Sequence, residues 1–217
     1  MTISETCRLA KEHANAAAFS AETEKNKMLS LAADALLARR GEILAANEED
    51  LRRFTRQDSL RDRLVLTESR IAGIAEGLRQ LTALPCPVGE VIEEHTTASG
   101  LDIARVRVPF GVVGIIYEAR PNVTADAIGL CLKSGNAVVL RGSKDAYFSN
   151  AAIVRVMKEA IAAGGFDPEF IQLLEDCTRE GAREFMRQKA YLDVLIPRGS
   201  AALIQSTLEN ATVPVIE

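Results

Sequence analysis

From residue 111 onward, short apolar runs alternate with stretches of helical periodicity, and this alternation constrains the fold more than any other feature of the chain. Each run has the length of one strand, and the runs are GVVGIIY, AVVLR, FIQLL, LDVLIP and VPVIE. Between them, apolar spacing predicts helices over residues 124–135, 146–165, 179–188 and 199–211. Continuous apolar strands separated by helices are typical of a parallel sheet covered on both faces. We therefore predict an α/β fold with a doubly wound, five-stranded parallel sheet and right-handed crossovers.

The first part of the chain follows a different pattern. Up to about residue 84, apolar residues recur at three- and four-residue spacing, as in the stripe 71–81, which is typical of amphipathic helices. The segment LPCPVGE at residues 84–90 interrupts this pattern with prolines and a glycine. We predict an N-terminal helical segment of residues 1–84 that packs on an α/β domain of residues 85–217.

Between these two parts, residues 101–108 read LDIARVRV, in which apolar and polar side chains alternate. Strict alternation is typical of a strand with one exposed face. Such a strand has two possible partners: another strand of the same chain, in a hairpin, or the sheet of a second subunit.

Composition excludes several classes of partner. The formal net charge of −4 lacks the basic surplus that binding to a phosphate backbone requires, so no nucleic-acid partner is expected. No apolar run of about 18 residues is present and the N-terminus turns polar at once, so we expect neither a membrane-spanning helix nor a secretory signal. The 4 cysteines lie far apart and only 2 histidines are present, which favours reduced thiols in a cytoplasmic protein and makes a metal site improbable.

Candidate binding residues follow the predicted strands, because ligands of open parallel sheets bind outside the carboxyl ends of the strands. After AVVL comes RGSKD, in which Arg141 and Lys144 flank Gly142 and Ser143. The cations and the hydroxyl suit a phosphate, and glycine permits a close backbone approach. A cationic turn at this place favours the 2′-phosphate of NADP, although a solvated turn is an equally good interpretation of these residues alone.

A second turn of this kind follows LDVLI, where Arg198, Gly199 and Ser200 open a predicted helix. The free N–H groups of a helix N-terminus can bind a pyrophosphate. Neither G-x-G-x-x-G nor G-x-x-x-x-G-K-[ST] occurs in the chain, so a bound dinucleotide would need an unorthodox arrangement.

The segment EARPNVT follows the first apolar run and offers groups for a substrate. Arg120 can grip a carboxylate or a phosphate with two hydrogen bonds, and Asn122 can donate to a developing oxyanion. The alternative is that Asn122 or Thr124 caps the next helix. No cysteine is a good candidate for a catalytic nucleophile. Cys131 lies on an apolar helix face and is predicted to be a small buried hydrophobe, and Cys177 has no histidine near it in the sequence.

The strings YEARPNVT, LKSGNAVVLRGSKDA and LIPRGS resemble the gamma-glutamyl phosphate reductase family of the aldehyde dehydrogenase superfamily, and the similarity runs through all 217 residues. The resemblance implies a Rossmann-like fold of the aldehyde dehydrogenase type. It also implies an activity: NADPH-dependent reduction of L-glutamyl 5-phosphate to L-glutamate 5-semialdehyde, with release of phosphate, in proline biosynthesis. A small-molecule substrate and a homo-oligomer are implied as well.

The resemblance assigns roles to individual cofactor residues. Arg141 and Lys144 stand at the two positions that contact the adenosine ribose in aldehyde dehydrogenases. A lysine in place of glutamate at the second position is what a preference for NADP(H) requires. Gly199 and Ser200 correspond to the pair that contacts the pyrophosphate.

The resemblance also assigns substrate and catalytic roles. Asn122 is a candidate for the oxyanion-binding asparagine, Glu217 falls near the glutamate base of the superfamily, and Arg120 is expected to hold the substrate's phosphate or carboxylate. The family's catalytic cysteine belongs to a second domain, and none of the 4 cysteines here matches its position. The chain is therefore expected to be the N-terminal, cofactor-binding half and to be inactive in isolation. The alternative is a non-catalytic nucleotide-binding or interaction module.

Overall fold

The computed structural model describes residues 1–55 and 58–217, and over residues 112–210 its helices and strands follow one another in the predicted order. The elements before the main sheet are α1 (Ile3–Glu12), α2 (Ala14–Ala18), α3 (Glu22–Ala38), α4 (Arg40–Arg53), α5 (Asp58–Leu64), α6 (Glu68–Ala83), β1 (Val91–Thr96) and β2 (Asp102–Val106). The remaining elements are β3 (Val112–Tyr117), α7 (Asn122–Lys133), β4 (Ala137–Arg141), the 3-10 helix η1 (Lys144–Ala146), α8 (Tyr147–Ala163), β5 (Ile171–Leu173), α9 (Arg179–Phe185), β6 (Val194–Arg198) and α10 (Ala201–Asn210). Within the described residues, no helix is both long and apolar enough to cross a membrane.

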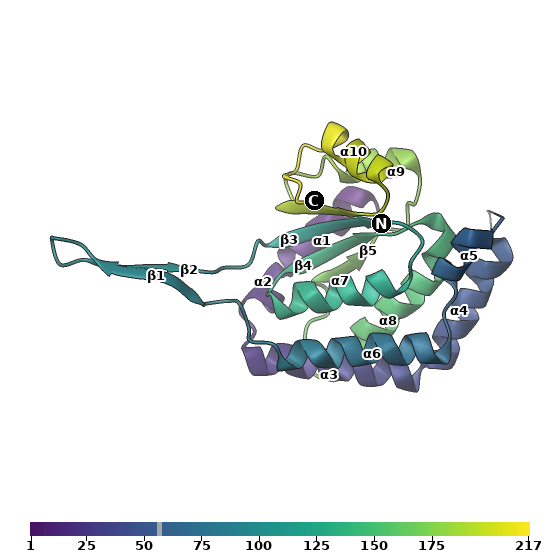
Figure 1. Cartoon of the computed structure of the whole chain (residues 1–217), viewed down its shortest axis with the longest axis horizontal. Coiled ribbons are helices and arrows are strands. Elements are labelled where there is room, and N and C mark those ends of the chain that lie inside the picture. Colours follow the sequence, from purple (N-terminus) through teal and green to yellow (C-terminus); the bar gives the residue numbers. More distant parts are fainter. Residues whose placement is uncertain (56–57) are drawn as a thin grey trace.

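A parallel sheet with the strand order β5-β4-β3-β6 forms the centre of the molecule. Every residue of β3 is buried, because α7 and α8 cover one face of the sheet while α1, α9 and α10 lie on the other (Figure 1). The helices α3, α4 and α6 pack against α7 and α8 from outside. The prediction of a parallel α/β sheet covered by helices is confirmed.

The apolar run VPVIE does not form the predicted fifth strand. It contributes one parallel bridge, between Leu195 and Val215, with hydrogen bonds from Leu195 N to Pro214 O (2.8 Å) and from Ile216 N to Leu195 O (2.9 Å). Pro214 has no N–H to donate, which limits the ladder that this segment can form. Among the described residues, the sheet therefore has 4 strands, and this part of the prediction is wrong.

The strands β1 and β2 form an antiparallel hairpin that projects from the body of the molecule (Figure 1). The predicted strand 101–108 thus pairs within the chain, as the hairpin interpretation requires, although its partner β1 was not predicted. All side chains of both strands are exposed, including Ile92 (45%) and Ile103 (41%). Because a two-stranded hairpin buries little apolar surface, it is marginally stable by itself in water.

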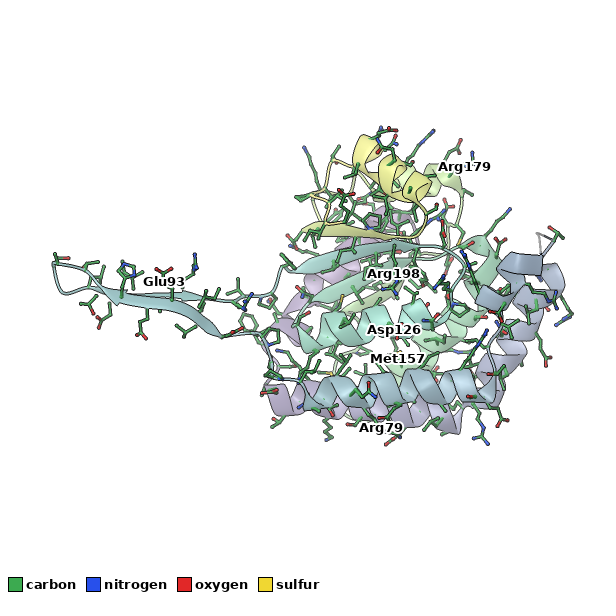
Figure 2. All side chains as sticks on the ribbon, viewed as in Figure 1. Arg79, Glu93, Asp126, Met157, Arg179 and Arg198 are labelled. Carbon is green, nitrogen blue, oxygen red and sulfur yellow. The ribbon has the colours of Figure 1, made fainter. Side chains whose placement is uncertain are left out.

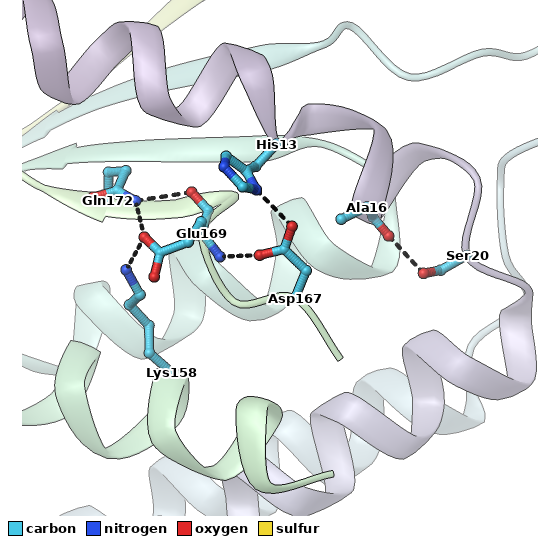
Figure 3. Close-up of polar contacts among 7 residues, drawn as sticks. All are labelled: His13, Ala16, Ser20, Lys158, Asp167, Glu169 and Gln172. Carbon is cyan, nitrogen blue, oxygen red and sulfur yellow. Dashed lines mark hydrogen bonds and ion pairs between the residues drawn. The ribbon is translucent and has the colours of Figure 1, made fainter. Parts of the chain in front are cut away.

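Polar contacts tie the N-terminal helices to the segment before β5. His13 Nδ1 lies 2.6 Å from Asp167 Oδ2, and Glu169 N donates to Asp167 Oδ1 over 2.8 Å (Figure 3). Lys158 Nζ and Gln172 Nε2 in turn donate to the carboxylate of Glu169. Burial alone would raise the pKa of Asp167, but the hydrogen bond to His13 holds that pKa below its usual value. The contact therefore stabilises the fold at neutral pH, and its contribution is lost as the pH falls through the lowered pKa.

Asp50 of α4 caps the N-terminus of α8. Its Oδ1 accepts a hydrogen bond from Phe148 N (3.1 Å), and its Oδ2 accepts from Ser149 N (2.8 Å) and from Ser149 Oγ (2.5 Å). The N-cap residue of α8 is Ala146, whose side chain cannot accept a hydrogen bond. Asp50 therefore satisfies amides that every helix leaves open at its start.

The Asp50→Ala substitution is expected to lower the free energy of unfolding by about 3 kcal/mol, because buried N–H groups lose their acceptor. Urea unfolding followed by circular dichroism measures this loss. Asp34→Ala is the matched control. Asp34 is an exposed residue of α3, and its Oδ1 accepts a hydrogen bond from Nη2 of Arg79, on α6, over 2.7 Å. It should change the stability by less than about 0.5 kcal/mol. Equal losses for the two variants would contradict the capping role.

Candidate active site

Three adjoining cavities lie at the edge of the sheet where the parallel strands β3, β4 and β6 end. Their volumes are about 340, 450 and 340 Å³, and Arg63 and Arg120 line all three. We call them together the arginine basin. The predicted site residues that line at least one of the cavities are Arg120, Asn122, Arg141, Ser143, Arg198, Gly199 and Ser200. The structure thus gathers residues from three separate strand ends, as the parallel topology requires.

Several cationic side chains at the carboxyl edge of the sheet form no ion pair with a described residue and can bind an anion. The side chains of Arg63, Arg120 and Arg198 form no ion pair and no hydrogen bond with another described residue. Lys144 is exposed, directly follows Ser143, and is equally unpaired within the described part of the chain. Cations without an ion pair that line adjoining cavities favour phosphate or carboxylate groups there, and the carboxylates of Glu118 and Asp126 offset part of this positive charge.

Arg63 is a basin residue that the sequence analysis missed. It belongs to α5, in the helical segment, and reaches the strand ends only because that segment packs beside the sheet. In the sequence it stands in a stretch rich in charged residues, which is typical of a solvated helix surface. No pattern in the sequence distinguishes Arg63 from its neighbour Arg61.

The N-terminus of α10 already carries an anion, the carboxylate of Glu118. Ser200 N donates to Glu118 Oε1 over 3.0 Å, while Ser200 Oγ accepts from Leu203 N. A Cβ atom on Gly199 would lie 2.8 Å from the Cγ and Cδ atoms of Glu118, so only glycine admits this approach. The hydrogen bonds from Ser200 lower the pKa of Glu118. A carboxylate therefore sits at the helix end where the sequence predicts a pyrophosphate.

Two predicted cofactor residues are engaged inside the protein. The Nη2 atom of Arg141 donates to the carbonyl oxygens of Cys177 (2.7 Å) and Thr178 (2.8 Å), and burial lowers the pKa of the Arg141 guanidinium. A Cβ atom on Gly142 would lie 2.3 Å from Asn150 Nδ2, so the missing side chain at this position serves internal packing. Their predicted contact with a cofactor stays a prediction.

Asn122 and Thr124 do not cap α7, and this alternative is wrong. The N-cap residue is Pro121, and it makes no side-chain hydrogen bond. Asn122 lies in the first turn and donates from Nδ2 to Asp126 Oδ2 over 3.2 Å. Thr124 is fully buried and donates to Asn150 Oδ1 over 2.9 Å. Asn122 is the one of the two that lines a cavity of the basin.

The cysteines and Glu217 lie outside this arrangement. Cys131 is 6% exposed, and burial raises the pKa of its thiol to about 12, which confirms its predicted character as a small buried hydrophobe. Burial also raises the pKa of the Cys177 thiol. Glu217 does not line any of the three cavities of the basin, so its predicted catalytic role stays a prediction.

The architecture is that of α/β proteins whose ligands bind at the carboxyl edge of a parallel sheet, and the cations that line the cavities at this edge suit an anionic ligand. The sequence matches the model of the aldehyde dehydrogenase family over residues 1–215, and the chain belongs to that family.

Within this family, the chain is similar to several proteins of the same name. The chain is 51% identical over 210 residues to the gamma-glutamyl phosphate reductase of Anoxybacillus flavithermus, which covers 95% of this chain and 51% of that protein. It is 54% identical over 196 residues to the enzyme of the same name from Neisseria gonorrhoeae, covering 89% of this chain and 47% of that one. The crystal structure of gamma-glutamyl phosphate reductase from Thermotoga maritima matches with a TM-score of 0.96 and 40% identity, covering all of this chain and 53% of that one. The chain thus spans about half the length of the relatives that it matches.

Proposed function

We propose that residues 85–217, with the helical segment 1–84 packed against them, form the NADP(H)-binding half of an enzyme that reduces L-glutamyl 5-phosphate. The products are L-glutamate 5-semialdehyde and phosphate, as in proline biosynthesis. The observation that carries the proposal is the arginine basin, in a chain with 51% identity to a gamma-glutamyl phosphate reductase. In this proposal the protein acts in the cytoplasm on a small molecule.

The residues of the basin, together with Lys144 next to it, fit the phosphates of a dinucleotide. Lys144 would hold the 2′-phosphate, while Arg198 and the first amides of α10 would hold the pyrophosphate, at the place where Glu118 now supplies an anion. The nicotinamide would supply the hydride. Arg120 would orient the substrate through an anionic group, and Asn122 would stabilise the oxygen on which negative charge develops. The nucleophilic thiol would come from outside these 217 residues, because none of the 4 cysteines lines a cavity of the basin and burial raises the pKa of the Cys131 and Cys177 thiols.

Titration of the chain with NADPH and with NADH, followed by nicotinamide fluorescence, tests the cofactor part of the proposal. NADPH should bind at least about tenfold more tightly than NADH, since only NADPH carries the 2′-phosphate. Equal affinities, or no binding of either nucleotide, would exclude it.

Replacing Glu118 with glutamine tests whether the pyrophosphate uses the N-terminus of α10. A carboxylate and a diphosphate repel one another when they share one helix end, so Glu118→Gln should bind NADPH about tenfold more tightly than the wild type. Glu209→Gln is a matched control, because Glu209 is exposed at the other end of α10. Unchanged or weaker NADPH binding by Glu118→Gln would place the pyrophosphate elsewhere.

A homo-oligomer is part of the proposal, and the hairpin is the surface that supports it. Val91, Ile92, Ile103 and Val106 are each more than two-fifths exposed on the two strands. An isolated hairpin gains stability when a further strand or a packed face covers it. Sedimentation equilibrium of the chain and of a variant without residues 91–106 should show assembly only for the complete chain.

A further inference from the structure

The cavity between α6 and the start of α7 carries charges of both signs. It has a volume of about 340 Å³, and its charged and polar lining residues are Arg63, Arg70, Arg120, Asn122 and Asp126. The apolar part of its wall comes from the residues Val65, Leu66 and Ile74. A concave site of this size with a few convergent polar groups is typical of a small-molecule site.

Asp126 supplies the negative charge of this cavity. Asp126 lies on α7, one helical turn after Asn122. Arg198, the last residue of β6, is labelled beside it in Figure 2. Among the described residues, only Asn122 donates a hydrogen bond to it, over 3.2 Å, and no ion pair is formed. Burial raises the pKa of Asp126, although the hydrogen bond from Asn122 and the charge of Arg198 oppose this effect. A partly buried carboxylate that forms no ion pair is costly, so a cationic ligand group would be stabilised there.

Two of the three arginines that line this cavity are available to a ligand. Arg70 is held by Asp62, through Oδ1 (2.9 Å) and the backbone carbonyl (2.6 Å), and by the carbonyl of Val65 (2.7 Å), so it shapes the wall. The guanidinium groups of Arg63 and Arg120 form no such contacts with described residues. An anionic ligand group can therefore bind them without breaking an existing ion pair.

We propose that this cavity binds the α-amino-acid end of the substrate, with Asp126 accepting the α-ammonium group and with Arg63 and Arg120 binding the α-carboxylate. The inference rests on the proposed function, and it adds two residues, Arg63 and Asp126, to the predicted substrate site. Charges of both signs in one cavity distinguish a zwitterion from a simple dicarboxylate, because the α-ammonium group and the α-carboxylate each meet a group of opposite charge.

L-Glutamate and glutarate are the probes, since they differ only in the α-ammonium group. Titration of the ¹⁵N-labelled 217-residue chain, followed by amide chemical shifts, gives the dissociation constant of each. The wild type should bind L-glutamate about tenfold more tightly than glutarate. Asp126→Asn should lose this preference while it binds glutarate as the wild type does. Asp34→Asn, which removes an exposed acid that does not line the cavity, should keep the preference.

Arg63→Gln and its neighbour Arg61→Gln test the binding of the α-carboxylate. Arg63→Gln should weaken both ligands about tenfold, whereas Arg61→Gln should leave both unchanged. A dispersed amide spectrum checks that each variant is folded, and Asp126→Ser replaces Asp126→Asn if the latter is not.

Three results would overturn the inference: equal affinity of the wild type for both probes, no binding of either, or an undiminished preference in both Asp126 variants. NADPH titration of the same samples separates this inference from the proposed function. NADPH binding without discrimination between the probes overturns the amino-acid site alone. Discrimination without NADPH binding overturns the cofactor proposal and leaves the amino-acid site in place.

Discussion

Replacing Gly111 with alanine is expected to lower the free energy of unfolding by about 4 kcal/mol. Gly111 precedes the central strand β3 with a φ of 117°, a conformation that strains any residue with a side chain. A Cβ atom there would lie 2.2 Å from Asp193 Oδ2, and this same oxygen accepts a hydrogen bond from Val112 N over 2.8 Å. Asp193 also pairs with Lys11 of α1 over 2.7 Å. The added methyl group therefore strains the backbone and displaces a carboxylate that joins α1, β3 and the segment before β6.

Gly165→Ala separates the two causes of this loss. Gly165 has a φ of 86°, but a Cβ atom there would meet nothing within 4 Å. This control should lose only the cost of backbone strain, about 1–2 kcal/mol. Chemical denaturation of both variants measures the difference. A loss for Gly111→Ala that is no greater than that for Gly165→Ala would show that Asp193 moves aside without cost.

The Lys144→Glu substitution is expected to reduce the preference for NADPH over NADH about a hundredfold, which corresponds to about 2.7 kcal/mol. The variant loses one attraction to the 2′-phosphate and gains a repulsion, while NADH, with its ribose hydroxyls, can donate to the new carboxylate. Lys144 is exposed and has no partner among the described residues, so the substitution breaks no contact of the fold. Fluorescence titration with both nucleotides measures the two affinities.

Lys189→Glu is the control for the change in net charge. Lys189 is exposed and lies between α9 and the start of β6, at the opposite end of that strand from the basin. This variant should keep the NADPH preference of the wild type. If Lys144→Glu also keeps it, Lys144 does not recognise the 2′-phosphate, and the cationic turn after β4 has another role.

The cavity-lining residues that were predicted from the sequence all lie at the end of a strand or a few residues after it. Arg120, Arg198 and Ser143 could be identified because parallel strands end at one edge of a sheet, so a turn sequence alone indicates which residues meet there. Arg63 and the position of Glu118 at α10 could not be identified in this way. Both depend on how loops and helices from distant parts of the chain pack against each other.

The prediction of a fifth strand failed for a related reason. VPVIE has the composition of a buried strand, but its ladder is limited to one bridge beside β6. Whether an apolar run becomes a strand depends on which donors and acceptors its neighbour leaves open. The strand β1 shows the opposite outcome. Its sequence VIEEHT lacks the apolar pattern of a strand, yet it forms one because β2 supplies hydrogen-bond partners in the hairpin.

Local patterns in the amino-acid sequence were sufficient to determine the α/β class, the order of helices and strands over residues 112–210, and the cationic turns at the strand ends, because apolar periodicity and turn residues act over a few neighbouring positions. The tertiary structure decided which of those cations stay unpaired. It turned Arg141 toward the carbonyl groups of Cys177 and Thr178, and it left Arg63, Arg120 and Arg198 facing shared cavities. Charge pairing depends on distances between side chains far apart in the chain, and those distances are set only when the helical segment packs on the sheet.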